Sequence, residues 1–347
     1  MKDVDKRFMA RALQLARIGG GNASPNPMVG AVIVHDGKII GEGWHRRCGE
    51  GHAEVNAVAL VRDRSLLPES TIYVTLEPCS HYGKTPPCAR LLIDSGIPRV
   101  VVGSLDPFEK VSGRGVAMLR EAGVDVIVGV LEEECRHLNR KFFTAHTMRR
   151  PFVTLKWAQS ADGYLDLKRM PGELSAKIST PVTSVLVNRE RSLHDAIMVG
   201  SGTVLADDPG LTLRGWGIGH DPVPVILDRE GIIPVGNRLL QNTRAIYFST
   251  TCREGIAAEK VAVDPHDLDS VLAELYDRGI TSVLVEGGAT LLHSFIDASL
   301  WDAVRVEVSP REFGEQGRVK APMFPDGTFQ LNGDTIIRKT KHTLNVI

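Results

Sequence analysis

Short runs of β-branched residues alternate with helix-like segments along the whole chain, and this alternation constrains the fold more than any other feature. In the first half the strand-like runs are residues 28–34, 38–44, 71–76, 99–103 and 125–129. Between them lie helix-like segments near residues 4–18, 53–64, 87–95 and 114–122. Strands that alternate with helices are typical of a layered sheet covered by helices. We therefore expect an α/β fold for this half.

A charged segment over residues 132–150 ends at Pro151, where a new strand pattern, FVTLKWA, begins. Strand-like runs then continue at residues 196–200, 223–228, 244–248, 281–286 and 302–308. A chain of 347 residues suits two domains, each of which buries its own core. We expect one domain over residues 1–147 and a second α/β domain over residues 148–347.

Charge and composition exclude several classes of protein. The net charge is −1 and no long run of lysine and arginine occurs, so the chain lacks the electrostatic footprint of a nucleic-acid-binding protein. No apolar stretch approaches the ~18 residues of a membrane span, and charges interrupt every apolar run at the amino terminus, unlike a signal peptide. Five cysteines, an odd and sparse number, favour a reducing compartment, and we expect the cytoplasm.

Zinc-ligand residue types stand at the expected ends of secondary-structure elements in the first half. His52 and Glu54 form an H-x-E pair at the start of a predicted helix. Cys79 follows Pro78 at the end of a predicted strand, and Cys88 stands where the next helix could begin. One imidazole and two thiolates leave an open position, typical of a catalytic zinc site, where the pKa of bound water falls to about 7. A carboxylate beside the metal can then move protons, as in zinc deaminases, and Glu54 is placed for that role.

The spacer between the two cysteines is longer than in the general deaminase motif P-C-x-x-C, because eight residues separate them. Two inert buried thiols are the alternative to a metal site. Within the spacer, His81 and Lys84 are suited to an anionic group of a substrate. Asn26, in the sequence SPNP, could hydrogen-bond the edge of a heterocycle, although SPNP also fits a simple turn.

The second half carries a weaker signal in SVLVEGGATLLHSF, residues 282–295, which predicts a strand, a glycine pair and a helix. Glycines there let backbone N–H groups approach a phosphate at the helix start, but a plain tight turn is equally compatible. The G-x-G-x-x-G pattern is absent, so a Rossmann dinucleotide fold is not supported. The loop over residues 200–214 is polar and long, which favours a binding role.

The motifs PNPMVGAVIV, HAEVNA, TLEPCSHYGKTPPC and SGRGVAMLREAG together resemble the deaminase half of the bifunctional riboflavin-biosynthesis deaminase/reductase family. The resemblance implies a cytidine-deaminase-like three-layer domain with Zn²⁺ on His52, Cys79 and Cys88, and Glu54 as proton carrier. It implies a phosphorylated diaminopyrimidine as substrate, a small molecule that the domain would deaminate. Asn26, His81 and Lys84 would contact this substrate.

TLKWAQSADG, MVGSGTVLADDPGLTLR and VEGGATL resemble the reductase half of the same family, which implies a dihydrofolate-reductase-like fold and NADPH. Lys156 and Glu286 would stand near the reacting ribosyl carbon. The NADPH contacts implied are Thr203, Asp207, Gly288, Ala289, Thr290, Leu291, Leu292, His293 and Ser294. The substrate contacts implied are Ser175, Arg191, Leu211, Arg214 and Glu286. Lys177, and the segments 164–178 and 310–347, depart from the family pattern.

Three functional hypotheses follow. The first is a two-step enzyme that deaminates the pyrimidine and then reduces the ribosyl group with NADPH. The second is a deaminase whose other domain is inactive or only binds substrate. The third is a nucleic-acid deaminase with an accessory module, against which the neutral charge and the long cysteine spacer both weigh. A homodimer or larger homo-oligomer is compatible with the resemblance.

Overall fold

The computed structural model describes residues 3–82, 86–108, 112–168, 173, 175–217, 219–323, 328–332 and 335–341. Lys84 lies outside these residues. The chain divides into two compact units, Met1–Arg149 and Arg150–Ile347, and each is described by itself. Among the described residues, no helix combines the length and the apolar character that crossing a membrane requires.

The first unit is built on a sheet of five strands in the order β2-β1-β3-β4-β5. These strands are β1 (Gly30–His35), β2 (Lys38–Trp44), β3 (Thr71–Leu76), β4 (Arg99–Ser104) and β5 (Asp125–Val128). The α-helices are α1 (Asp3–Gly19), α2 (Ala53–Ala59), α3 (Cys88–Asp94), α4 (Arg114–Glu121), α5 (Glu132–Leu138) and α6 (Arg140–Met148). Two 3-10 helices, η1 (Gly20–Ala23) and η2 (Arg64–Glu69), complete the unit. The pairs β1–β2 and β1–β3 are antiparallel, whereas β3, β4 and β5 run parallel.

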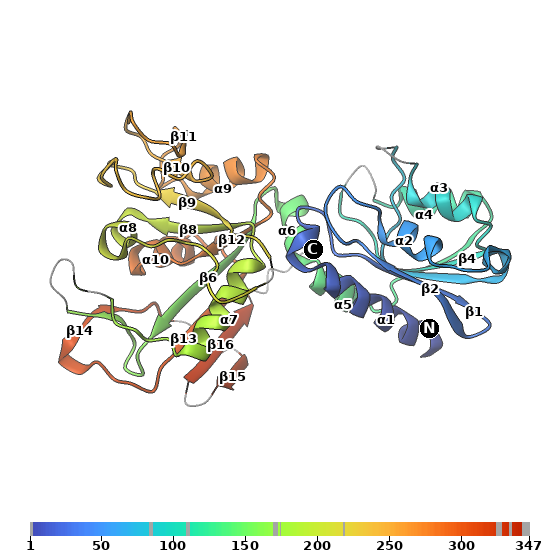
Figure 1. The fold of residues 1–347 in the computed structure, drawn as a ribbon, viewed down its shortest axis with the longest axis horizontal. Coiled ribbons are helices and arrows are strands. Elements are labelled where there is room, and N and C mark those ends of the chain that lie inside the picture. The colour runs from blue at the N-terminus through green and yellow to red at the C-terminus, as the bar shows by residue number, and fades with distance from the viewer. Residues whose placement is uncertain are drawn as a thin grey trace. The chain divides into compact units, whose positions relative to one another are not determined.

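Helices cover both faces of this sheet, so the unit has three layers (Figure 1). Alternate residues of β1 enter different cores: Ala31 and Ile33 pack with α2, α3 and α4, while Val32 and Val34 pack with α1 and α5. This alternation follows from the two-residue period of a strand. Gly43 lets α2 lie directly on β2, because a Cβ there would overlap the carbonyl oxygen of Ala53. The start of α2 is thereby held against the sheet.

The second unit contains a sheet of nine strands in the order β11-β10-β9-β8-β12-β6-β13-β16-β15, with β7 and β14 as a separate pair. The strands are β6 (Phe152–Gln159), β7 (Tyr164–Leu167), β8 (Ala196–Gly200), β9 (Val223–Leu227), β10 (Ile246–Phe248), β11 (Glu259–Val261), β12 (Ser282–Val285), β13 (Ala303–Val308), β14 (Gly317–Lys320), β15 (Thr328–Asn332) and β16 (Thr335–Lys341). The helices are α7 (Pro181–Ser192), α8 (Ser201–Asp207), α9 (Leu268–Asp277), α10 (Ala289–Asp297) and the 3-10 helix η3 (Gly314–Gln316). The seven strands from β11 to β13 run parallel, and β16 and β15 extend the sheet with antiparallel pairing.

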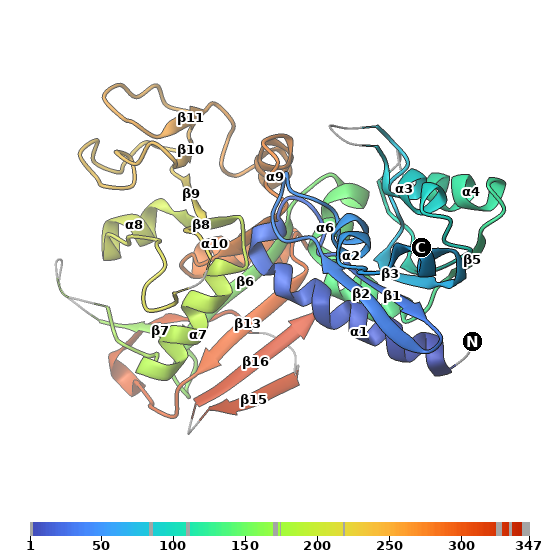
Figure 2. The same cartoon turned by 45° about the vertical axis from the view of Figure 1, so that its right-hand side comes forward.

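The two faces of this sheet are covered differently. Helices α9 and α10 cover one face and bury an apolar core there. This core includes Leu155 of β6 and Val306 of β13. On the other face lie α7 and α8, and Figure 2 shows α7 beside β13. Polar contacts fasten α7 there: His194, just after the helix, hydrogen-bonds Thr154 of β6, and Thr183 hydrogen-bonds Glu307 of β13. Over β6 and β13 the second face is therefore polar, whereas over β8, β9 and β10 it carries a second apolar core that includes Val204 of α8.

The predicted α/β class of both halves is confirmed. Three element predictions were wrong in extent by two residues or more at one end, and one of them is the strand predicted over 28–34, which begins only at Gly30. The helix predicted over 53–64 ends at Ala59, because the N–H groups of Leu60 and Val61 turn back to Ala57 and Val58 in a tighter turn. Asp63 then caps η2 by accepting from the N–H of Ser65. The strand predicted over 244–248 begins only at Ile246, and β7, β11, β14, β15 and β16 were not predicted.

Candidate active sites

The first site is a cluster of one histidine and two cysteines in the first unit. The ligand atoms of His52, Cys79 and Cys88 all lie within 4.8 Å of one another. His52 Nδ1 is 3.6 Å from Cys79 Sγ and 3.3 Å from Cys88 Sγ. Zinc–sulfur bonds of about 2.3 Å and zinc–nitrogen bonds of about 2.0 Å, at tetrahedral angles, require ligand separations of about 3.5 Å. The donor set and its spacing therefore fit a zinc ion.

Local structure explains why these three side chains converge. His52 is the residue that precedes the first turn of α2, and Cys88 is the first residue of α3. Cys79 lies three residues beyond the end of β3, and its sulfur accepts a hydrogen bond from the backbone N–H of Cys88 at 3.3 Å. Gly115 of α4 admits the turn at Pro78, because a Cβ there would overlap the Pro78 carbonyl oxygen. Two helix starts and one strand end thus meet at one point.

Hydrogen bonding holds one of the two thiols as a thiolate before any metal binds. The hydrogen bond from Cys88, aided by His52, lowers the pKa of Cys79 to about 4. The same pairing, together with burial, raises the pKa of Cys88. A thiolate is the form that binds a metal, so the cluster is prepared for a cation.

Glu54 lies beside the cluster in the first turn of α2 and is 3% exposed. Burial raises the pKa of its carboxyl group from 4.5 to about 7, although the charge of His52 opposes the shift. A carboxyl group that titrates near neutral pH can both accept and give a proton.

The other predicted contacts of this site differ in how well they are placed. Asn26 is half-buried, and its Nδ2 lies 3.2 Å from Nε2 of His45. His45 in turn lies 3.3 Å from the carbonyl oxygen of Gly51 and meets the His52 ring edge-on at 5.5 Å between centroids. His81 is exposed. His45 therefore joins the site, at the end of β2, although the sequence analysis did not select it.

Asp106 is a second residue that the geometry adds. It follows the end of β4, next to β3, and burial raises the pKa of its carboxyl group to about 6, with the charges of Glu77 and Cys79 adding to the shift. Its own N–H donates to Glu77, which also accepts from the N–H groups of Gly113 and Val116. The position of Asp106 in the sequence could have identified it, because it comes just after a parallel strand that neighbours the strand leading to Cys79.

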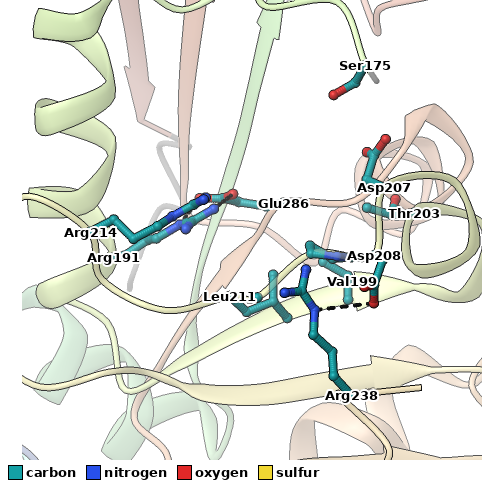
Figure 3. A pocket seen from close by; sticks show the side chains of 12 residues that line it. Ser175, Arg191, Val199, Thr203, Asp207, Asp208, Leu211, Arg214, Arg238 and Glu286 are labelled. Carbon is teal, nitrogen blue, oxygen red and sulfur yellow. Dashed lines mark hydrogen bonds and ion pairs between the residues drawn. The ribbon is translucent and has the colours of Figure 1, made fainter. Parts of the chain in front are cut away.

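The second site is a cavity of about 350 Å³ in the second unit. Its lining residues come from segments far apart in the chain: Ser175, Arg191, Val199, Thr203, Asp207, Asp208, Pro209, Gly210, Leu211, Arg214, Arg238 and Glu286. Figure 3 shows Arg191 and Arg214 side by side near Glu286, with Thr203 and Asp207 across the cavity. Asp208 and Leu211 have φ angles of 37° and 51°, so the loop that carries them is held in a sparsely populated conformation, as is common at binding sites.

A buried ion pair forms the floor of this cavity. Arg191 Nη2 lies 2.7 Å from Glu286 Oε2, and Arg191 Nε lies 3.1 Å from Oε1. Burial alone would raise the pKa of Glu286, but the charges of Lys156 and Arg191 outweigh it and hold the pKa at about 2. Burial lowers the pKa of Lys156, against the opposing charge of Glu286. Glu286 is therefore a carboxylate at neutral pH, whereas Lys156 gives up its proton more readily than an ordinary lysine.

The predicted cofactor segment begins at the amino end of α10, which Gly288 precedes. The Gly288 N–H donates to the Thr203 hydroxyl at 3.0 Å, which ties α8 to α10. The N–H groups of the first helical turn have no partner within a helix. Leu292 is fully buried in the core, so any contact from it must be through the backbone. His293 and Ser294 hydrogen-bond the carbonyl oxygens of their own helix, at Ala289 and Thr290.

Ser175 lies at the cavity, on the side opposite the arginines (Figure 3). Lys177, two residues further along, is exposed and does not line the cavity. The departure of this position from the family pattern therefore leaves the described cavity lining unaffected.

Family comparisons cover both units. Residues 151–343 match the family described as the RibD C-terminal domain. Residues 2–104 match the cytidine and deoxycytidylate deaminase zinc-binding region. The chain is 41% identical over 324 residues to the riboflavin biosynthesis protein RibD of Aquifex aeolicus (strain VF5), covering 91% of this chain and 89% of that protein. It is 36% identical over 334 residues to that of Escherichia coli (strain K12), covering 90% of each.

Solved structures agree with these matches. A diaminohydroxyphosphoribosylaminopyrimidine deaminase/5-amino-6-(5-phosphoribosylamino)uracil reductase from Thermotoga maritima superposes with a TM-score of 0.87 at 39% identity, covering 98% of this chain and 99% of the other. RibD of Acinetobacter baumannii gives a TM-score of 0.86 at 33% identity, covering 97% and 98%. Similarity over both units does not favour a nucleic-acid deaminase with an accessory module. The chain belongs to the family of bifunctional riboflavin-biosynthesis enzymes, which join a zinc-dependent pyrimidine deaminase to an NADPH-dependent reductase.

Proposed function

We propose that the two sites act in sequence on one small phosphorylated pyrimidine. The first site removes an amino group from 2,5-diamino-6-ribosylamino-4(3H)-pyrimidinone 5′-phosphate, and the second reduces the ribosyl group of the product to a ribityl chain. The observation that carries the first step is the cluster of His52, Cys79 and Cys88 with the buried carboxyl group of Glu54 beside it.

In the deaminase site His52, Cys79 and Cys88 would hold the zinc ion. When bound there, zinc acts as a Lewis acid that makes water reactive at neutral pH. Glu54 takes the proton released from that water and passes it to the departing amine, which a pKa near neutrality allows. Asn26, oriented by His45, donates a hydrogen bond to the ring edge. His81 and Lys84 contact the phosphorylated end of the substrate.

In the reductase site Arg214 binds the substrate phosphate, and Leu211 and Ser175 are further proposed substrate contacts, Ser175 from the opposite side of the cavity. NADPH supplies the hydride. Thr203, Asp207 and the amides at the start of α10 are the proposed cofactor contacts. Lys156 gives the accompanying proton, because its pKa is lowered by burial. Glu286 is ionised at neutral pH, so its proposed part is to orient Arg191 and to balance the charge of Lys156.

Two further points belong to the proposal. We place the protein in the cytoplasm, since none of its five cysteines forms a disulfide, as expected in a reducing compartment. We also propose that the chain assembles as a homodimer or larger homo-oligomer.

Mass spectrometry of the substrate after incubation with and without NADPH tests the proposal. Deamination changes the mass by +1 when an amine is replaced by a carbonyl group, and reduction adds two hydrogens. The expected result is the deaminated mass without NADPH and the deaminated, reduced mass with NADPH. Deamination alone in both incubations would mean that the second unit only binds.

A further inference from the structure

Arg305 of β13 is a buried arginine to which the two steps above give no role, and its guanidinium lacks the partners that buried arginines normally have. It is 3% exposed, and its Nη1 is fully buried without a hydrogen-bond partner among the described residues. Two other buried arginines of the unit are paired: Arg150 binds both oxygens of Asp302, and Arg191 binds both oxygens of Glu286. A buried cationic donor without an acceptor is unstable unless a ligand supplies one.

Arg305 stands at the end of a row of charged residues that crosses three neighbouring parallel strands. In the sheet order, β12 adjoins β6, and β6 adjoins β13. Val285 pairs with Leu155, so Glu286 is level with Lys156, and Lys156 pairs directly with Arg305. Neighbouring strands lie about 4.8 Å apart. The row therefore extends about 10 Å from Glu286, at the floor of the cavity, to Arg305.

The row lies on the face of the sheet that α7 covers, in the part over β6 and β13 that is polar. Val304 and Val306, on either side of Arg305, belong to the core under α9 and α10, so Arg305 points to the opposite face. There Glu307 accepts a hydrogen bond from the hydroxyl of Thr183 on α7 at 2.5 Å. Arg305 is thus placed in the layer between α7 and the sheet, which also holds Lys156.

Charge in this layer is unbalanced. The groups whose charges act on Lys156 are Glu286, Arg305, Arg191 and Glu307, so with Lys156 itself there are three cations and two carboxylates. Glu286 is already bound by Arg191, and Glu307 is bound by hydroxyl groups. Within the described part of the chain, Arg305 is left with no bound carboxylate and with Lys156 as a like-charged neighbour, an arrangement that an acceptor oxygen beside Arg305 would stabilise.

Resting on the proposed function, we propose that Arg305 binds the ring carbonyl oxygen that deamination creates, and thereby selects the deaminated pyrimidine as the reductase substrate. Arg214 lines the cavity at the Glu286 end of the row, where the phosphate is proposed to bind. The row then leads past Lys156, at the reacting carbon, to Arg305 at the ring. A guanidinium only donates hydrogen bonds. The guanidinium can therefore donate to the carbonyl oxygen of the product. It cannot hydrogen-bond the amino group of the undeaminated compound in the same way, because that group is itself a donor.

The test compares wild type with Arg305→Met, which keeps the length of the side chain and removes its donors. Reductase kcat/KM is measured with the uracil compound and with the undeaminated diaminopyrimidinone. Both proteins also carry Glu54→Gln, so that their own deaminase site does not convert the second compound into the first. For the uracil compound we expect kcat/KM to fall about 10- to 100-fold, mainly through KM, as for the loss of a hydrogen bond to a charged donor. For the diaminopyrimidinone it should stay unchanged or rise. Arg311→Met removes an exposed arginine shortly after β13 and is the matched control.

Binding and stability measurements separate this role from the alternatives. Ribose 5-phosphate lacks the ring and should bind wild type and Arg305→Met equally in calorimetry, whereas the uracil compound should bind the variant more weakly. Arg305→Met should keep or raise the melting temperature, because it removes a buried unpaired charge. Arg305→Lys keeps the charge and should restore part of the affinity.

Equal loss with both pyrimidines, weaker binding of ribose 5-phosphate, or unchanged binding of the uracil compound would each overturn the proposal. If wild type failed to oxidise NADPH with the uracil compound, the reductase function itself would fail. Calorimetry would even then decide the role of Arg305, because tighter binding of the uracil compound to wild type than to Arg305→Met requires no turnover.

Discussion

Two enclosed glutamates, one in each unit, have pKa values that are shifted in opposite directions. Glu54 is surrounded by a histidine and two cysteines, and burial raises its pKa from 4.5 to about 7. The Glu286 side chain is 11% exposed, yet its pKa lies at about 2, because Lys156 and Arg191 outweigh the effect of burial. Both side chains lie in candidate active sites, and both were selected from sequence as catalytic residues.

The difference lies in what each carboxyl group touches. Glu286 accepts two hydrogen bonds from a guanidinium, which makes it a fixed countercharge that no longer exchanges protons at physiological pH. Glu54 has no comparable ion pair among the described residues, so its proton is available. Burial of a carboxyl group therefore does not define its role, and its partners do.

The largest expected effect tests the proton-exchanging member of the comparison. Glu54→Gln should reduce ammonia release at least about a thousandfold, because general acid–base catalysis contributes 10²–10⁴-fold and this side chain serves both transfers. Zinc content, measured by atomic absorption, should remain near one ion per chain, since Glu54 is outside the cluster of ligand atoms.

Glu50→Gln is the control for that experiment, as Glu50 precedes the same helix and is exposed. It should leave ammonia release unchanged. The reductase activity of Glu54→Gln, assayed with substrate that is already deaminated, should equal that of wild type. Retained deaminase turnover, or loss of zinc together with activity, would contradict the assignment of Glu54.

Lys156→Met gives the next largest effect and asks which group in the second site moves a proton. If Lys156 is that group, reductase kcat should fall about 100- to 1000-fold, with NADPH binding measured by fluorescence titration unchanged. Lys260→Met, on the edge strand β11, is the matched control. A Lys156 variant with normal kcat would return the catalytic assignment to Glu286.

Most of the deaminase site could be predicted from sequence because its residues are carried by local motifs. His52 and Glu54 are fixed by one helix start, and Cys79 and Cys88 by a strand end and the next helix start. His45 and Asp106 were not selected, because what places them is pairing between strands: β2 beside β1, and β4 beside β3. Such proximity depends on sheet order, which the sequence of a single chain does not reveal.

The reductase site was less accessible to sequence analysis for the same physical reason. Lys156 on β6 precedes Glu286, just after β12, and Arg305 on β13 by more than a hundred residues in the chain, although the three strands are adjacent in the sheet. The family resemblance supplied Arg191 and Glu286 as separate substrate contacts. Only the structure shows that they bind each other, which changes what each can do.

An acid titration tests the contrast between Glu54 and Glu286 through a smaller effect, a change in the free energy of unfolding. The ordinary pKa of a glutamate, 4.5, falls to about 2 for Glu286, so this pairing contributes about 3 kcal/mol to stability. The contribution is complete above about pH 4.5 and is lost as the pH falls toward about 2. Wild type should therefore lose about 3 kcal/mol more than Glu286→Gln over that range.

Tryptophan fluorescence during urea unfolding can measure this difference in the full chain, because Trp157, Trp216 and Trp301 lie in the second unit and only Trp44 lies in the first. Unfolding free energies of wild type and Glu286→Gln are compared at several values between pH 7 and pH 2.5. A gap between the two proteins that stays constant or widens as the pH falls would mean that Glu286 is not held ionised.

The smallest effect is expected at the rim of the second site, where charges are exposed and water screens them. Arg214→Ala should raise the reductase KM about tenfold with little change in kcat, as expected when a phosphate contact that is equally strong before and during reaction is removed. Arg238 also lines the cavity, but it is bound to Asp208 at 3.2 Å and is half-exposed. Arg238→Ala should therefore change KM less than about threefold. The two arginines resemble each other in position and differ in pairing, as the two glutamates do. If both variants raised KM equally, the ion pair of Arg238 would not reduce its contribution to substrate binding. Ion pairing would then set the roles of the two enclosed glutamates but not those of these two exposed arginines.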